Sequence, residues 1–254
     1  MTGPAPDNNC PAPARLPDAR SAAGQRFRAL PQVRHWLSLG ALLCVAVIAL
    51  GLAVQLVPGD TAAELGVDQG LSLHHAAALT SVAMAINVLF GPVAGLALVG
   101  AVALYLWLVR RDLVKAAGFG VVACSGWAAS EAFKLLIARP RPDPTLLFDP
   151  LAPETGADSF PSGHVAFAVA LAFALYFLAR GTRWSTAAAA AGAAMALIVA
   201  WSRLYIGVHY PTDVAASFLA AGAAVVLLAG LWNRFGPRLV ARLPDAVFLR
   251  SSRP

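Results

Sequence analysis

Long apolar runs without charged residues constrain this chain more than any other feature of its sequence. Residues 80–109 are 30 consecutive uncharged positions, and residues 36–57 form a second such run. A helix needs about 20 apolar residues to cross the roughly 30 Å of hydrocarbon in a bilayer. Because backbone groups in lipid must be hydrogen-bonded within the spanning structure, runs of this length predict transmembrane helices. We therefore expect an all-α, polytopic membrane protein.

Charged segments and segments rich in Pro or Gly divide the apolar runs into six expected transmembrane helices, arranged as a bundle. Within the second run, Gly91-Pro92 marks either a kink or the point where the true span begins. Residues 60–75 are polar enough to lie outside the hydrocarbon. The expected spans cover residues 36–57, part of 80–109, 113–137, 161–179, 184–201 and 214–232.

The sequence also predicts three regions and an orientation. Residues 1–34 are rich in Pro, Ala and Arg and lack an apolar period, which predicts a disordered tail. Residues 35–235 hold the six expected helices, and residues 236–254 form a basic tail. Of the 19 Lys and Arg residues, 15 lie in the two tails and in the two short loops on the same side. The positive-inside rule therefore predicts cytoplasmic termini in the plasma membrane, with the long loops outside.

Composition argues against several other classes of protein. The net charge is +6, but the N-terminal arginines have no interleaved aromatic residues, so we expect no nucleic-acid partner. Cys10, Cys44 and Cys124 are scattered and are interpreted as unpaired. The adjacent His74 and His75 lack an acidic partner at ligand spacing and are interpreted as surface residues. The sequence does not indicate an oligomeric state.

The basic residues that oppose the predicted topology lie in two of three short segments that interrupt the apolar runs. Residues 134–142 end the third expected span, residues 159–164 open the fourth, and residues 202–213 join the fifth to the sixth. Ionisable residues at the ends of such apolar segments are costly and usually functional. We therefore expect the three segments to close one site at the outer surface. The four exceptions are Lys134, Arg139, Arg141 and Arg203.

The charges in these segments suit a phosphate ligand. Lys134, Arg141 and Arg203 supply three positive charges, and the two guanidinium groups can bind phosphate oxygens in a bidentate manner. Ser162 can cap the fourth helix or donate a hydrogen bond, while Gly163 allows close backbone approach. The free N–H groups at that helix N-terminus would complete an anion-binding site.

Two histidines can then act on the bound phosphoryl group. Asp213 falls in the first turn of a helix that starts at Pro211, where its carboxylate can hold one N–H of His209. The other imidazole nitrogen is then free to attack phosphorus. His164 can protonate the departing alkoxide. The sequence contains no Asp/Glu cluster with metal spacing, so we expect neither a metal nor another cofactor.

The order and spacing of these residues resemble the three-part signature of the type 2 phosphatidic acid phosphatase family. The resemblance covers residues 134–213 and implies that His209 forms a phosphohistidine, with Asp213 as its partner and His164 as the general acid. It further implies a phosphoryl-binding set of Lys134, Arg141, Ser162, Gly163 and Arg203. The matching parts are Lys134 with Arg141-Pro142, then Pro161-Ser162-Gly163-His164, then Ser202-Arg203 with His209 and Asp213.

Residues beside the signature have simpler interpretations. Glu131 lies one turn before Lys134 and is expected to form an ion pair with it. Tyr205 and Tyr210 are interpreted as packing residues of the membrane interface. For Arg139, a contact close to the site or with a lipid headgroup, and no role at all, are both open.

Together these features predict an integral membrane lipid phosphatase that needs no metal and acts at the extracytoplasmic face. Its expected partners are the bilayer and a lipid phosphate, either a polyprenyl diphosphate such as undecaprenyl diphosphate or a phosphatidate-type lipid. Two alternatives stay open. One is a phosphotransferase that passes the phosphoryl group to an acceptor other than water. The other is a catalytically silent protein that binds or transports lipids.

Overall fold

The computed structural model describes residues 27–57, 59–152 and 154–243, and within these ranges every regular element is a helix. The expected all-α fold class is confirmed for this part of the chain. Cys10 and most of the two predicted tails lie outside the described residues. The elements are α2 Trp36–Leu56, α3 Asp60–Ser72, α4 Ala77–Leu89, α5 Pro92–Leu104, the π-helix η1 Tyr105–Val109, α6 Leu113–Ile137, the 3₁₀ helix η2 Pro144–Leu146, α7 Gly163–Ala179, α8 Ser185–Ile206 and α9 Pro211–Val240.

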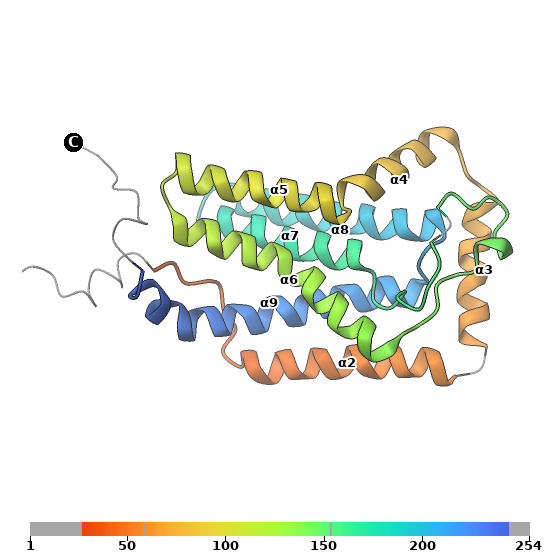
Figure 1. Ribbon diagram of the computed structural model, residues 1–254, viewed down its shortest axis with the longest axis horizontal. Helices are drawn as coiled ribbons and strands as arrows, with labels where there is room; N and C mark the ends of the chain where they lie inside the picture. The colour runs from red at the N-terminus through yellow and green to blue at the C-terminus, as the bar shows by residue number, and fades with distance from the viewer. Residues whose placement is uncertain (1–26, 58, 153, 244–254) are drawn as a thin grey trace, which may run out of the picture.

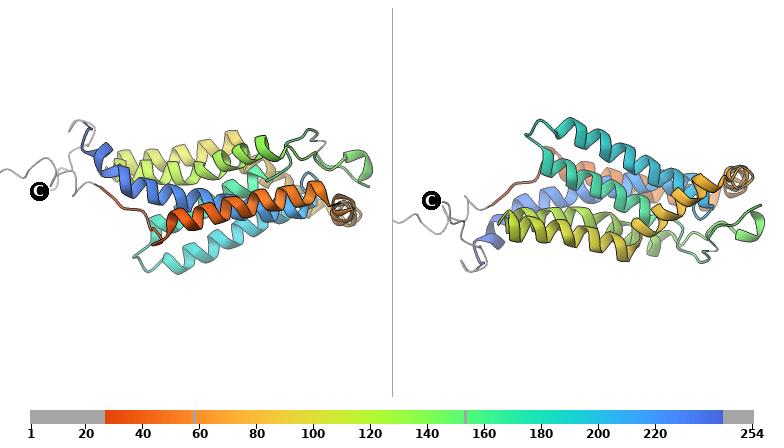
Figure 2. Two further views of the ribbon diagram at one scale, coloured as in Figure 1. Left: turned by 90° about the horizontal axis from the view of Figure 1, so that it is seen from below. Right: turned by 90° about the horizontal axis from the view of Figure 1, so that it is seen from above.

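The long helices form a bundle around α7 (Figure 1). Helices α2, α5, α6, α7, α8 and α9 run along the bundle axis, and α7 packs against α6, α8 and α9. Helix α3 crosses one end of the bundle almost perpendicular to that axis and is seen end-on in both views of Figure 2. The loop between α6 and α7 lies at the same end, beside α3 (Figure 1).

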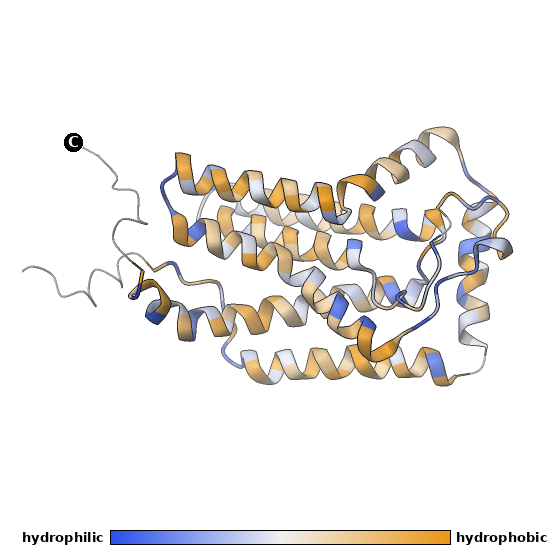
Figure 3. Cartoon of the chain, in the orientation of Figure 1, coloured by the Kyte–Doolittle hydropathy of each residue, from blue (hydrophilic) through white to orange (hydrophobic). Residues whose placement is uncertain are grey.

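Five of the described helices are long and apolar enough to cross a membrane: α2, α5 together with η1, α6, α8 and α9. Helix α4, with 13 residues, and helix α7, with 17 residues, are apolar but shorter. Large apolar side chains cover the outside of the bundle, for example Val93, which is 87% exposed. Figure 3 shows hydrophobic residues along the helices and hydrophilic residues gathered at their ends. Such a surface suits a lipid environment.

Several helix boundaries follow from local sequence signals. Helix α6 covers the predicted residues 113–137, and the α4–α5 break falls at Gly91, as the Gly91-Pro92 pair indicates. Helix α8 ends later than expected, because its stop signal is Gly207 in a left-handed conformation at φ 77°. Pro211 occupies the first turn of α9, which continues to Val240, past the expected domain end at 235.

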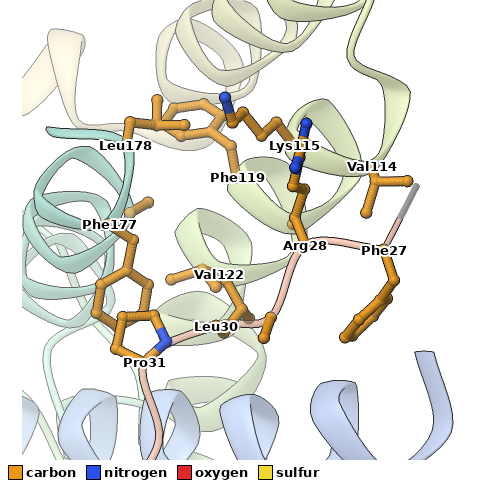
Figure 4. Close-up of a pocket in the computed structure, with 13 residues that line it drawn as sticks. Phe27, Arg28, Leu30, Pro31, Val114, Lys115, Phe119, Val122, Phe177 and Leu178 are labelled. Atoms are coloured by element: carbon orange, nitrogen blue, oxygen red, sulfur yellow. The ribbon is translucent and has the colours of Figure 1, made fainter. Parts of the chain in front are cut away.

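The described residues of the predicted N-terminal tail lie against the bundle. Phe27 stacks on Trp232 at 6.2 Å between ring centroids, and the Leu30 N–H donates to the Asn233 side chain at 2.9 Å. Between this segment and helices α6 and α7 is a cavity of about 350 Å³, drawn in Figure 4. Arg28 and Lys115 are the charged residues among those that line it. It lies at the end of the bundle opposite α3 and is separate from the three signature segments.

Close approach of α6 to α7 depends on Gly126. A Cβ atom at this position would lie 2.1 Å from the Ala166 carbonyl oxygen, a distance that requires the two helices to separate. We expect Gly126→Ala to lower the thermal unfolding temperature of the purified protein by roughly 5 °C or more, since overpacking of a core costs about 1–3 kcal/mol. The matched control is Gly120→Ala in the same helix, where a Cβ atom meets no atom within 4 Å. Equal unfolding temperatures for the two variants would contradict this explanation.

Candidate active site

The α3 end of the bundle brings together the three signature segments, which come from different helices (Figure 1). Lys134 lies in the last turn of α6, and Arg141 lies in the loop that follows. Ser162 is the N-cap residue of α7. Arg203 lies in the last turn of α8, and the short connection from there to α9 carries His209. Hydrogen bonds and ion pairs link the basic groups and His209 to one another.

The basic groups are linked to one another by shared carboxylates. Glu154 accepts hydrogen bonds from Arg141 at 2.6 Å and from Arg203 at 3.2 Å, so that one carboxylate bridges the two guanidinium groups. Asp158 binds Arg141 through both oxygens, at 2.8 and 3.1 Å, and lies 4.0 Å from Lys134 Nζ. The predicted ion pair of Lys134 with Glu131 is confirmed at 2.8 Å. Arg141 contributes to the lowered pKa of Asp158 through these hydrogen bonds.

His209 is buried, and its surroundings define which nitrogen carries the proton. Nδ1 lies 2.8 Å from the Ser159 carbonyl oxygen, which can only accept, so Nδ1 carries the hydrogen. Nε2 then has a free lone pair, and it faces Arg141 Nη1 at 3.4 Å. The expected direct hydrogen bond from His209 to Asp213 is not formed, because Asp213 Oδ2 lies 3.7 Å from Nδ1. Ser159 is closer and takes that position.

Burial keeps the His209 imidazole neutral. Desolvation is the main cause that lowers its pKa to about 4, and the charges of Arg203 and Arg141 lower it further. The neighbouring Asp213 opposes this shift and does not overcome it. At neutral pH the ring is therefore uncharged and its Nε2 lone pair is available as a nucleophile.

The N-terminus of α7 presents unoccupied hydrogen-bonding groups to this cluster. The Ser162 hydroxyl is buried and has no hydrogen-bond partner among the residues that the structure describes. A Cβ atom at Gly163 would lie 3.7 Å from Lys134 Nζ, so the ammonium group approaches the backbone closely at this point. A buried hydroxyl, an ammonium group and a helix N-terminus in one place can bind an anion.

His164 is connected to the cations through Asn87 of α4. Gly91 N–H bonds to the Val88 carbonyl at 3.2 Å, which leaves the Asn87 carbonyl free to accept from His164 Nε2 at 3.1 Å. The Asn87 side-chain oxygen also accepts a hydrogen bond from Arg203. The α4–α5 break that the sequence indicated therefore places an acceptor for His164, a consequence that the sequence did not show.

Several functional candidates were not identified from the sequence. Arg139, whose role was left open, is 2% exposed and bonds to Asp213 at 2.6 Å. Its second partner is Glu64 of α3, at 2.5 Å. His75, interpreted as a surface residue, instead has a buried side chain between Asp149 and the Tyr205 carbonyl, at 2.9 and 2.8 Å. Each of these partners is distant in sequence, so local patterns could not reveal them.

Asp68 of α3 is fully buried beside this network, and neither of its carboxylate oxygens has a hydrogen-bond partner in the described part of the chain. Desolvation is the main cause that raises its pKa to about 8, and the nearby Asp213 and Glu64 add to the shift, while Arg139 opposes it. Within the described ranges, no group of three or more His, Cys, Asp or Glu side chains could hold a metal ion.

This raised pKa predicts that stability falls as pH rises. The unfolded chain loses the Asp68 proton near pH 4, whereas the folded protein keeps it until about pH 8, so folding is favoured at the acid end of this window. The contribution is lost at up to about 1.4 kcal/mol per pH unit. Thermal unfolding between pH 5 and 8 should show a smaller decline for Asp68→Asn than for the unaltered protein. Parallel declines would show that Asp68 does not titrate in this window.

Comparison with known proteins finds a family that resembles this chain. The PAP2 superfamily matches residues 115–237, a segment that includes all three signature segments. Over this segment the chain is similar to the PAP2 superfamily. Combined with the apolar helices, this similarity indicates a multi-pass membrane protein. The family match begins in α6, so α2, α3, α4 and α5 lie outside it.

Two curated relatives match parts of the chain. YbjG of Escherichia coli (strain K12), whose name assigns it provisionally to the undecaprenyl-diphosphatases, is 37% identical over 86 residues. The undecaprenyl-diphosphatase BcrC of Bacillus subtilis (strain 168) is 28% identical over 134 residues. The matches cover 34% and 50% of this chain, and 41% and 64% of the respective relatives, less than two thirds of either one.

Two solved structures share the fold. A transmembrane PAP2-type phosphatidylglycerolphosphate phosphatase from Bacillus subtilis superimposes with a TM-score of 0.64 at 23% identity. That similarity covers 77% of this chain and 96% of the other. LpxE from Aquifex aeolicus gives a TM-score of 0.51 at 22% identity, over 65% of this chain and 93% of the other. At these identities the likeness concerns the fold.

Proposed function

We propose that this protein is an integral membrane lipid phosphatase that works through a phosphohistidine at His209. The observation that carries the proposal is the state of His209 itself. Its Nδ1 is bonded to the Ser159 carbonyl at 2.8 Å, and its free Nε2 faces Arg141 among several cations. A neutral imidazole with one nitrogen fixed and the other directed at an anion-binding cluster is suited to attack on phosphorus.

The phosphoryl group would be held by the cations and by the N-terminus of α7. Arg141 and Arg203 now share the Glu154 carboxylate, and a phosphoryl group also offers a pair of acceptor oxygens, with more charge. We infer that it takes the place of Glu154 between the two guanidinium groups. Lys134, Ser162 and the Gly163 N–H would bind its remaining oxygens.

The reaction then proceeds in two displacements. His209 Nε2 forms a bond to phosphorus as the bond from phosphorus to the leaving oxygen breaks, and His164 gives that oxygen a proton when it leaves as an alkoxide. Water next attacks the phosphohistidine, His164 accepts a proton from that water, and the N–P bond breaks to release inorganic phosphate. Cations stabilise the charge on the equatorial oxygens throughout, so no metal is needed in this scheme.

The proposed topology has six spans, with α7 as the central one and α2, α5, α6, α8 and α9 around it. Helix α7 has 17 residues, at the lower limit for a span, and it is enclosed by other helices. With both termini in the cytoplasm, the α3 end of the bundle and its active site face outward from the plasma membrane. The distribution of Lys and Arg supports this orientation.

Cysteine labelling tests the orientation. Thr155 is exposed in the α6–α7 loop at the site end, and Arg183 is exposed in the turn between α7 and α8 at the opposite end. We expect Thr155→Cys to react with a membrane-impermeant thiol reagent added to intact cells, because the site faces outward. Arg183→Cys should react only after the cells are opened. The reverse pattern would place the active site in the cytoplasm.

A site beside the helix ends suits a substrate whose hydrophobic tail stays in the bilayer. Two lipid classes fit: a polyprenyl diphosphate and a phosphatidate-type lipid. Similarity to proteins named as undecaprenyl-diphosphatases supports the polyprenyl diphosphate. Fold similarity to a phosphatidylglycerolphosphate phosphatase is the reason to test the phosphatidate-type lipid as well. The outward orientation favours the diphosphate, since that lipid carrier is released outside.

The decisive assay measures inorganic phosphate released by the purified protein from undecaprenyl diphosphate, phosphatidate and phosphatidylglycerol phosphate. We expect release at an unchanged rate in excess chelator. Strong inhibition by chelator would reveal a metal requirement and contradict the metal-free scheme. Label transferred to a second acceptor would indicate a phosphotransferase. Binding without any transfer would indicate a silent lipid-binding protein.

A further inference from the structure

Helix α3 lies outside the segment matched by the family, yet it is bonded to the N-terminus of α9, where Asp213 lies. Glu64 of α3 makes these bonds. Its Oε1 accepts from the Thr212 N–H at 2.8 Å, and its Oε2 accepts from the Thr212 hydroxyl at 2.9 Å. Oε2 also accepts from Arg139 Nη2 at 2.5 Å. The Glu64 side chain therefore joins α3 both to Arg139 of the α6–α7 loop and to Thr212 of α9.

Arg139 continues this connection to the carboxylate of the candidate site. Its Nη1 donates to Asp213 Oδ1 at 2.6 Å and to the Thr212 hydroxyl at 2.7 Å. The guanidinium lies 4.1 Å from the centre of the Tyr210 ring, and the side chain is 2% exposed. A guanidinium buried to this degree is stable only when its charge is paired, and here it is paired with Asp213 and with Glu64.

The network reaches His209 through Ser159. The Ser159 hydroxyl donates to Asp213 Oδ2, and its carbonyl accepts from His209 Nδ1 at 2.8 Å. The Ser159 N–H donates to the Arg139 carbonyl at 3.0 Å. Arg139 thus holds Ser159 through its backbone and Asp213 through its side chain. Both residues that hold the nucleophile depend on this one arginine.

We propose that Arg139 and Glu64 are positioning residues that fix Asp213 and Ser159, and through them the orientation of His209. The inference rests on the proposed function, because it concerns the attack of His209 on phosphorus. Attack on phosphorus requires Nε2 to lie in line with the leaving oxygen, and a small misplacement is costly in rate. Arg139 makes no contact with the phosphoryl-binding cations, so it affects the turnover step rather than substrate binding.

The test compares three variants of the full chain: Arg139→Ala, Glu64→Gln and the control Arg183→Ala. Arg183 is an exposed arginine over Trp184, distant from the site. Each purified protein is assayed for kcat and KM on whichever lipid of the panel above the unaltered chain hydrolyses fastest. We expect kcat to fall by about 100-fold for Arg139→Ala and about tenfold for Glu64→Gln, with KM within about threefold of the starting value.

Chemical rescue of kcat distinguishes a positioning role of Arg139 from a purely structural one. Guanidinium ion added at concentrations below those that unfold the protein should restore kcat of Arg139→Ala by about tenfold, since it can occupy the space between Asp213 and Glu64. It should not change kcat of Arg183→Ala. Lack of rescue in a folded Arg139→Ala protein would overturn the proposal.

Glu64→Gln keeps the test valid if Arg139→Ala does not fold. Glutamine has the same shape as glutamate and can still accept from Thr212, but it lacks the charge that pairs with Arg139. A folded Glu64→Gln protein with unchanged kcat would overturn the inference. Failure of the unaltered protein to act on any lipid phosphate would instead end the proposed function, so the two failures are distinguishable.

Discussion

His209→Ala will reduce the release of phosphate from lipid substrates by about 10⁴-fold or more, while the protein remains folded. The reason is that, in the proposed mechanism, this side chain supplies the nucleophile. Its Nδ1 is bonded to the Ser159 carbonyl at 2.8 Å, which leaves Nε2 as the reactive nitrogen. Its pKa near 4 keeps that nitrogen unprotonated at neutral pH. Alanine removes the attacking atom and leaves the cations in place, so substrate binding should persist.

Two measurements check this result. The first is phosphate release by the purified protein, with His74→Ala as the control, because His74 is an exposed histidine outside the cluster. The second is covalent labelling. The unaltered protein quenched during turnover should carry phosphate that is stable to base and lost in acid, as a phosphohistidine is, and His209→Ala should carry none. Residual activity above a few per cent would refute the assignment of His209 as the nucleophile.

His164→Ala will affect the two substrate classes differently, because their leaving groups differ. Phosphatidate releases an alkoxide, which needs a proton as the bond to phosphorus breaks. A polyprenyl diphosphate releases a phosphate monoester, whose second pKa is near 6 and which departs without one. We expect phosphorylation of His209 by phosphatidate to slow by about 10²–10⁴-fold, the usual contribution of a general acid. Phosphorylation by the diphosphate should change far less.

The second step of the reaction gives a second measurable difference between the two substrates. In the proposed scheme, hydrolysis of the phosphohistidine also uses His164, now as the base that accepts a proton from water. His164→Ala should therefore accumulate labelled protein when given the diphosphate and little label when given phosphatidate. Rapid-quench measurement of labelled protein against time separates the two steps. Equal loss of phosphorylation rate on both substrates would show that His164 does not protonate the leaving group.

The long apolar helices could be predicted from the sequence, because the bilayer imposes length and apolarity on each spanning segment directly, whereas helix α3 was not predicted. Residues 113–137 were expected to form a helix and do so as α6. The break between α4 and α5 falls at Gly91, where Gly91-Pro92 indicates it. The end of α8 was harder to predict, since Ser202 and Arg203 looked like part of a polar connection. They are helical because the stop signal is Gly207.

The candidate site was predicted in its composition but not in its connections. The types and spacing of Lys134, Arg141, His164 and His209 indicated phosphate chemistry without any coordinates. The expected hydrogen bond from His209 to Asp213 was wrong in detail, since Ser159 provides the acceptor. Its position in the sequence, between Asp158 and Phe160, gave no sign of that role.

By itself, the sequence determined the all-helical class, most boundaries of the long apolar helices and the residue types of the candidate phosphate site. These depend on local signals, namely apolar length, helix stops and short spacings within one segment. Only the tertiary structure decided that Glu64 binds Arg139, 75 positions away, or that Asn87 joins His164 to Arg203. Such pairs form because buried charges and carbonyls must find partners, and the packing of the helices decides which partners are within reach.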